Sequence, residues 1–206
     1  MLLPELREEI VETGRRIYEL RLVTDLSGNI SARDAESGLI AIKPSGVHWM
    51  EIQPEDIVIM DEQANIVEGS RKPSIETPMH TAIYRHYPET GAVVHTHSPY
   101  ATGFAAARKP IPPVCINSAE VGGEIPITPY HPPGSQEMAQ SAVECLRAKK
   151  AALIAAHGVV CIGKDLQQAV YFNTLVELIA QLALIRQILG SEAQLTPEQL
   201  SALGVN

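Results

Sequence analysis

The stretch GAVVHTH, residues 91–97, predicts a β-strand that ends in two histidines. Its valine and threonine residues favour extended backbone. His95 and His97 are two positions apart, so in a strand both imidazoles project from the same face, with their Cα atoms roughly 7 Å apart. This arrangement suits two ligands of one metal ion, although an HxH pair also occurs by chance.

A third histidine follows the next strongly apolar segment. AALIAAHG, residues 151–158, is typical of a strand that ends in His157, and VVCIG, residues 159–163, is expected to continue that strand or to pair with it. Three imidazoles leave a fourth coordination position open, which is typical of catalytic rather than structural zinc. The spacing alone does not decide between a metal site and three unrelated histidines.

The segments around these strands alternate between helical and extended patterns. Thr77 followed by Pro78 is expected to be the N-cap and first residue of a helix that runs to about Tyr87. Further helices are expected at residues 4–22, 135–147 and 165–189, with strands at 39–46, 56–61 and 65–69 and short strands within 109–133. The segment SGNIS, residues 27–31, is expected to interrupt the pattern.

The helix expected at 165–189 carries two apolar stripes. One consists of Tyr171, Leu175, Leu178, Leu182, Ile185 and Leu189, and the other includes Phe172, Val176, Ile179 and Ala183. A helix that is apolar on two sides needs two surfaces to cover it. The two interpretations are a deeply buried helix and a subunit interface.

Length and charge limit the classes of protein to consider. A chain of 206 residues fits one domain, residues 1–206, with its own core. The net charge of −8 gives no general attraction for nucleic acid or for an anionic membrane surface. We find no signal-peptide pattern and no apolar run long enough to span a bilayer. Three cysteines without a CxxC pair favour a reducing cytoplasm.

Other polar residues could surround a metal. Glu76 directly precedes the helix expected at Thr77, where a carboxylate either favours the positive end of the helix dipole or acts as a general base. His80, four residues on, is expected to be structural or to support the site. Three turns could bind an anion through N–H and hydroxyl groups: Ser27-Gly28-Asn29, Ser45-Gly46 and Lys72-Pro73-Ser74. Taken singly, each is ordinary turn chemistry.

Taken in order, five short motifs resemble the class II aldolase/adducin family. They are SGNIS, KPSG, KPSIE, HTH and AHG, and the resemblance covers about residues 5–190. Within the family, the L-fuculose-1-phosphate aldolases are the most similar. The resemblance implies an α/β protein, a three-layer α/β/α sandwich with a central, mostly antiparallel sheet. It also implies a homotetramer with active sites between neighbouring subunits.

The resemblance also implies roles for individual residues. His95, His97 and His157 match the ligands of one divalent ion per subunit, Zn²⁺ or another divalent transition metal, and Glu76 matches the catalytic glutamate. The positions that hold the substrate phosphate are matched by Gly28, Asn29, Ser45, Gly46 and Ser74.

Some positions depart from the family pattern. Ile75 stands where the fuculose-phosphate aldolases have a second serine, and Ile116 falls where their proton-donating tyrosine is expected. Tyr130 is one candidate to accept the C4 hydroxyl proton instead. The 4-epimerases have aspartate in place of Glu76 and a further acid near residues 119–120, where Glu120 lies. No tyrosine follows Tyr171 to act as a C-terminal donor, so these features favour an aldolase over an epimerase.

The function that the resemblance implies is a zinc-dependent lyase. It would cleave a ketose 1-phosphate, of the L-fuculose-1-phosphate kind, into dihydroxyacetone phosphate and an aldehyde. Zinc would polarise the substrate carbonyl, and Glu76 would transfer the proton at C3. The alternative is an epimerase or dehydratase of the same family, acting on L-ribulose 5-phosphate or methylthioribulose 1-phosphate. A non-enzymatic scaffold is disfavoured because all three histidines are present.

Overall fold

The computed structural model describes residues 1–205 and is built on one seven-stranded sheet. Its strands are β1 (Asn29–Arg33), β2 (Ile40–Ile42), β3 (Val58–Met60), β4 (Ile66–Glu68), β5 (Ala92–Thr96), β6 (Ala151–Ile154) and β7 (Gly158–Gly163). They lie in the order β4-β3-β2-β1-β5-β7-β6, and each neighbouring pair is antiparallel. Asn206, the last residue of the expected domain, lies outside the described residues.

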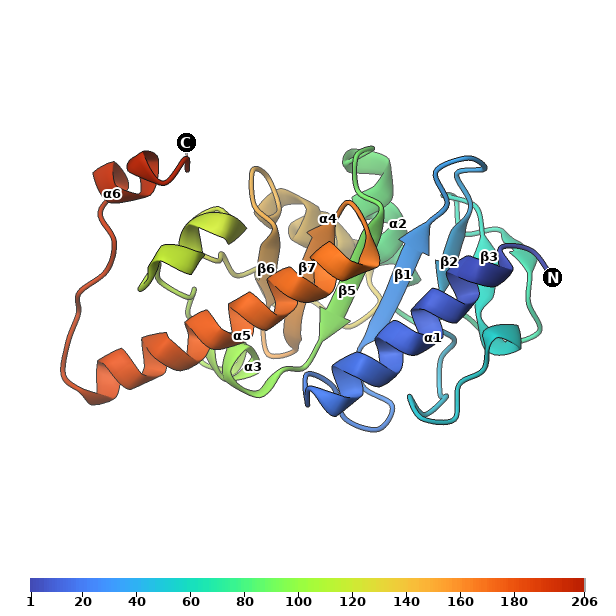
Figure 1. Ribbon diagram of the computed structural model, residues 1–206, viewed down its shortest axis with the longest axis horizontal. Helices are drawn as coiled ribbons and strands as arrows, with labels where there is room; N and C mark the ends of the chain where they lie inside the picture. The colour runs from blue at the N-terminus through green and yellow to red at the C-terminus, as the bar shows by residue number, and fades with distance from the viewer. Residues whose placement is uncertain (206) are drawn as a thin grey trace.

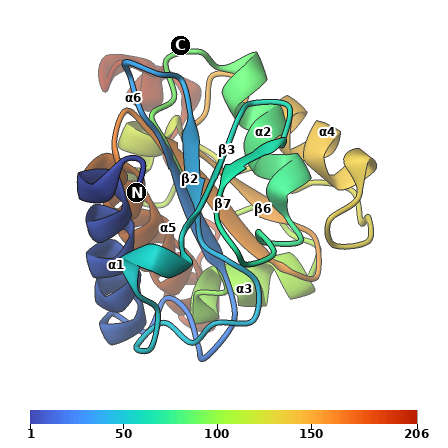
Figure 2. The same ribbon diagram turned by 90° about the vertical axis from the view of Figure 1, so that its right-hand side faces the viewer.

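Helices cover both faces of the sheet. The described helices are α1 (Pro4–Glu19), α2 (Thr77–His86), α3 (Pro99–Ala106), α4 (Gln136–Cys145), α5 (Leu166–Ile188) and α6 (Pro197–Ala202), with short 3₁₀ helices η1 (Pro54–Asp56) and η2 (Ile116–Val121), and α6 lies beyond the end of the sheet (Figure 1). Helices α1 and α5 cross one face (Figure 1), and the side view places α2 and α4 on the other (Figure 2). The prediction of a three-layer α/β/α fold with an antiparallel sheet is confirmed.

The alternation of side chains along β5 explains the two apolar layers. Val94 packs with the α1 side of the sheet, in a cluster that includes Ile30 and Val170. Val93 points the other way, into a cluster with Met79 and Met138 of α2 and α4. Because β5 is hydrogen-bonded on both edges and covered on both faces, the strand that carries His95 is held rigidly.

A buried arginine ties α1 to the edge of the sheet. Arg7 is only 1 % exposed, and its guanidinium donates to the carbonyl oxygens of Leu2 (2.7 Å), Pro54 (3.1 Å) and Ile57 (2.5 Å). It also pairs with the Glu68 carboxylate at 2.6 Å. Such a group is stable in the interior only because each of its three nitrogens finds a partner.

The two apolar stripes of α5 differ in burial. Phe172, Val176, Ile179 and Ala183 are buried, and so is Leu175, whereas Tyr171, Leu178, Leu184, Ile185, Ile188 and Leu189 are exposed. By length and composition the helix could cross a membrane, with a mean hydropathy of 1.4 over its most apolar window. Half of that window is buried against the sheet, as in the core helix of a globular domain.

Several local predictions were wrong. Residues 29–33 form β1 instead of interrupting the pattern, and α3 was not expected. Residues 109–133 contain η2 and isolated bridges rather than short strands. The strand expected at 151–158 ends at Ile154, so His157 lies in the turn before β7, which pairs with β6. The N-cap of α2 is Glu76, and Thr77 is its first helical residue.

Candidate active site

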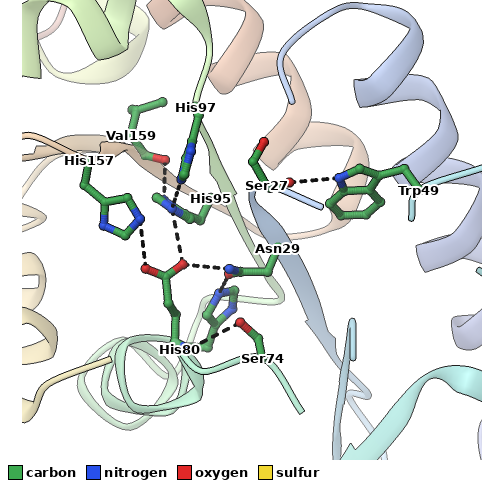
Figure 3. A network of polar contacts seen from close by, with 10 residues as sticks. Ser27, Asn29, Trp49, Ser74, His80, His95, His97, His157 and Val159 are labelled. Atoms are coloured by element: carbon green, nitrogen blue, oxygen red, sulfur yellow. Dashed lines mark hydrogen bonds and ion pairs between the residues drawn. The ribbon is translucent and has the colours of Figure 1, made fainter. Parts of the chain in front are cut away.

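Three histidines converge at the end of β5. His95 and His97 project from the same face of the strand, as their spacing predicts, and the β6–β7 turn brings His157 beside them. One nitrogen from each ring lies within 4.8 Å of the others. The Nε2 atoms of His95 and His97 are 3.2 Å apart, and Figure 3 shows the three rings turned toward one another.

Two glycines allow the neighbouring backbone to come this close. A Cβ atom on Gly158 would lie 2.3 Å from the Thr96 carbonyl oxygen and 3.0 Å from the His97 ring. A Cβ atom on Gly28 would lie 2.7 Å from the His95 carbonyl oxygen, and its φ of +71° also favours glycine. Both glycines therefore serve the packing around the histidine strand.

Glu76 closes the open side of the histidine cluster. It is 3 % exposed, and its carboxylate oxygens face two different imidazoles: Oε2 lies 3.2 Å from His95 Nε2, and Oε1 lies 3.2 Å from His157 Nε2. The Asn29 side-chain amide donates to Oε2 at 2.7 Å. The Ser74 hydroxyl accepts the Glu76 backbone N–H at 3.2 Å, which fixes the start of α2.

The cluster has unusual protonation equilibria. Burial lowers the pKa of His95 to about 4, and burial together with the nearby His157 lowers the pKa of His97. Burial acts to raise the pKa of Glu76, but the charges of His95 and His157 and the Asn29 hydrogen bond outweigh it and lower that pKa. At neutral pH His95 and His97 are therefore neutral imidazoles and Glu76 is a carboxylate, the forms that bind a metal ion.

The donor set fits a divalent cation. His95 Nδ1 lies 3.0 Å from the Val159 carbonyl oxygen, which can only accept, so the ring proton is on Nδ1 and Nε2 carries a lone pair. That lone pair faces another acceptor, the Glu76 Oε2 atom. Glu76 Oε1 has no hydrogen-bond partner among the described residues. A cation bound by His95, His97 and His157 would satisfy these lone pairs.

A cavity of about 310 Å³ opens from the histidines. It is lined by Glu76, His97 and His157 and by the five residues that were predicted to hold a phosphate: Gly28, Asn29, Ser45, Gly46 and Ser74. His95 lies beneath this surface and is fully buried. Segments that are far apart in the sequence thus meet in one pocket, next to the three histidines that could hold a metal ion.

Lys43 is a pocket residue that sequence reasoning missed. It lines the cavity, is 2 % exposed, and places its ammonium 4.6 Å from the centre of the Trp49 ring. Burial lowers the pKa of Lys43 to about 8. Its backbone carbonyl accepts the Ser74 N–H, which joins two of the turns, and Trp49 donates to the Ser27 carbonyl in the third. Lys43 is the first residue of the KPSG motif, but the motif suggested a phosphate-binding role only for Ser45 and Gly46.

Tyr130, the candidate to accept the C4 hydroxyl proton, and Ile116, which stands where a tyrosine was expected, both lie elsewhere in the chain. Tyr130 is 60 % exposed and lies beside Arg108, and Ile116 is 68 % exposed at the start of η2. Tyr171 donates to Glu120 at 2.7 Å on the outer side of α5. None of these residues lines the cavity within the described chain.

Comparisons with known proteins agree with this geometry. The family model described as "Class II Aldolase and Adducin N-terminal domain" matches residues 8–184. The chain is 37 % identical over 198 residues to the 5-deoxy-D-ribulose 1-phosphate aldolase of Bacillus thuringiensis serovar kurstaki (strain ATCC 35866 / NRRL B-4488 / HD73), covering 96 % of this chain and 92 % of the relative.

Solved structures give the same result. An L-fuculose 1-phosphate aldolase superposes with a TM-score of 0.94 at 32 % identity, over 97 % of this chain and 94 % of the other. The L-fuculose-1-phosphate aldolase of Thermus thermophilus superposes with a TM-score of 0.79 at 25 % identity, over 93 % of this chain and 98 % of the other. The chain therefore belongs to the class II aldolase and adducin family, as a lyase of the aldolase type.

Proposed function

We propose that this chain is a zinc-dependent aldolase that cleaves a ketose 1-phosphate into dihydroxyacetone phosphate and an aldehyde. The observation that carries the proposal is the arrangement of the cavity. It is lined by Glu76, His97 and His157, with His95 buried beside them, and by Lys43 and small, donor-rich turns. The names of two similar proteins, which act on 5-deoxyribulose 1-phosphate and fuculose 1-phosphate, suggest the substrate class.

The residues of the chain account for phosphate binding. Because the net charge is −8, the protein repels an anionic substrate at long range, and affinity has to come from local donors. The ammonium of Lys43, the hydroxyls of Ser45 and Ser74 and the backbone of Gly28 and Gly46 can supply them. The Asn29 side chain is held by Glu76 and His80, so its contribution to phosphate binding would come mainly from its backbone.

Glu76 is the proposed proton-transfer residue. During cleavage the C4 hydroxyl loses its proton and becomes an aldehyde, the C3–C4 bond breaks, and its electron pair stays on the C3 side. A carboxylic acid at position 76 then donates a proton to C3, and in the reverse direction the carboxylate removes it. When bound, the metal ion supplies a Lewis acid for the substrate carbonyl.

We also propose that the active form is a cytoplasmic homotetramer with active sites at the subunit interfaces. The exposed apolar residues of α5, including Ile188 at 74 % and Leu189 at 77 % exposure, support an additional protein contact. A neighbouring subunit could then supply the group that takes the C4 hydroxyl proton. Three free cysteines suit a reducing compartment.

The test is a screen of ketose 1-phosphates with the zinc-loaded protein, with release of dihydroxyacetone phosphate as the measured product. 5-Deoxyribulose 1-phosphate and fuculose 1-phosphate are expected to be cleaved, and Glu76→Gln is expected to bind zinc but to lose about a hundredfold or more in kcat. Products that keep the carbon skeleton intact would instead indicate the epimerase or dehydratase alternative. Near-normal turnover by Glu76→Gln would leave Glu76 with only a structural role.

A further inference from the structure

A line of buried polar side chains runs from Glu76 into the protein between α2 and β1. Glu76, the N-cap of α2, and His80 and Tyr84 within that helix follow one another at intervals of four residues, which places them on one side of it. On β1, Asn29 and Ser31 are two residues apart and project from one face of the strand. The side chains of the two elements alternate in a continuous chain of hydrogen bonds.

The distances along this chain are short throughout. Tyr84 Oη lies 2.9 Å from Ser31 Oγ, which lies 2.6 Å from His80 Nδ1. His80 Nε2 lies 2.5 Å from Asn29 Oδ1, and Asn29 Nδ2 lies 2.7 Å from Glu76 Oε2. His80 and Ser31 are fully buried, and Tyr84 is 1 % exposed, so water does not compete with these bonds.

The donor and the acceptor of each hydrogen bond in this chain follow from the ionised state of the Glu76 carboxylate. An ionised carboxylate can only accept, so the amide nitrogen of Asn29 faces Glu76 and its oxygen faces His80. His80 Nε2 must then carry the ring proton. A neutral imidazole has one such proton, so His80 Nδ1 accepts from Ser31, and the Ser31 oxygen accepts from Tyr84. Burial lowers the pKa of His80 to about 3, which keeps the ring neutral.

The opposite tautomer of His80 would disturb Glu76. With the proton on Nδ1, His80 Nε2 would become an acceptor, and the Asn29 amide would have to turn its nitrogen toward it. The Asn29 oxygen would then face the Glu76 carboxylate, and two acceptors would lie 2.7 Å apart. The buried environment makes such an unpaired arrangement costly. His80 therefore decides which way Asn29 points.

We propose that His80 is a positioning residue that, through Asn29, fixes the orientation in which the Glu76 carboxylate exchanges a proton with the substrate, with Oε2 held by the Asn29 amide. The inference rests on the proposed function, in which Glu76 transfers that proton. Oε2 accepts from Asn29, whereas Oε1 has no hydrogen-bond partner among the described residues. Without the Asn29 hydrogen bond the carboxylate can rotate away from this orientation.

Two matched variants separate positioning from packing. In His80→Gln the side-chain amide nitrogen can take the place of Nε2 and still donate to Asn29. In His80→Asn the shorter amide reaches only the place of Nδ1, so it keeps the contact with Ser31 and loses the donor to Asn29. We expect His80→Asn to lower kcat about ten- to a hundredfold with zinc content and KM little changed, and His80→Gln to retain most of the activity.

A double variant tests the route through Asn29. Once Asn29→Ala has removed the link, His80→Asn is expected to cause little further loss in kcat, because residues that act through one network are not additive. Equal losses in His80→Gln and His80→Asn, or fully additive losses in the double variant, would overturn the proposal.

The tautomer of His80 can be measured without any substrate. In an imidazole ¹H–¹⁵N spectrum of the zinc-loaded protein, His80 is expected as the neutral Nε2–H form, with its signals displaced in Asn29→Ala. An Nδ1–H form would refute the bond directions and with them the proposal, whatever the activity. A wild type that cleaves no ketose 1-phosphate would count against the proposed function, and the spectrum would still decide on the hydrogen-bond chain.

Discussion

The charge of Lys43 gives a pH-dependent prediction. Burial disfavours the ammonium form, so the pKa of Lys43 is lowered from 10.5 to about 8, and the charge is lost as pH rises through that value. The charged fraction then falls from about 0.9 at pH 7 to about 0.1 at pH 9, by the definition of the pKa. A sugar phosphate has a second pKa of about 6 and is mainly dianionic over this range.

The measurement compares wild type with Lys43→Met on a ketose 1-phosphate. A charge-assisted hydrogen bond to the phosphate should make wild-type kcat/KM about ten- to a hundredfold larger at pH 7. Because kcat/KM reports the free enzyme, this advantage should shrink about five- to ninefold between pH 7 and pH 9. Lys43→Arg, which keeps its charge, should show an advantage independent of pH. A constant ratio of wild type to Lys43→Met across this range would refute a phosphate contact through the ammonium.

Three further predictions concern the metal, the fold and the assembly. Purified protein should carry about one zinc or similar ion per chain, and His95→Ala/His97→Ala should remove it; full metal occupancy in that double mutant, measured by elemental analysis, would contradict the site. Arg7→Met should lower the free energy of unfolding by about 3 kcal/mol, because it leaves buried carbonyls without donors; a loss below about 1 kcal/mol in urea unfolding would mean that water replaces the guanidinium. Ile188→Glu should dissociate the oligomer in sedimentation velocity, and a monomeric wild type at micromolar concentration would contradict the assembly.

Features with a local cause were predictable from the sequence. The alternation in residues 91–97 places His95 and His97 on one face, and the structure has this arrangement. The helix start near Thr77 was also predicted, displaced by one residue because Glu76 takes the N-cap position. In both cases the residues that decide the structure are neighbours in the chain.

Features that depend on distant partners were not predictable. β1 contains polar residues that look like turn formers, and Asn29 and Ser31 are buried in a strand only because Glu76 and His80, 47 and 49 residues away, supply their hydrogen bonds. Lys43 looks like an ordinary surface lysine until Trp49 and the neighbouring turns enclose it. The local pattern of polar and apolar residues does not show which distant segments will form hydrogen bonds with each other. The cost of burying Asn29, Ser31 or Lys43 is offset only by groups from other segments.

The boundary between Ile75 and Glu76 has a consequence for how this protein can change over evolution. The two residues are adjacent, yet Ile75 is 66 % exposed at the rim of the cavity, whereas Glu76 is 3 % exposed and held by contacts on several sides. Replacing Ile75 alters the lining of the cavity without breaking a bond to the Glu76 carboxylate. Selection for a new substrate can therefore act on position 75 while the carboxylate at position 76 is inherited unchanged.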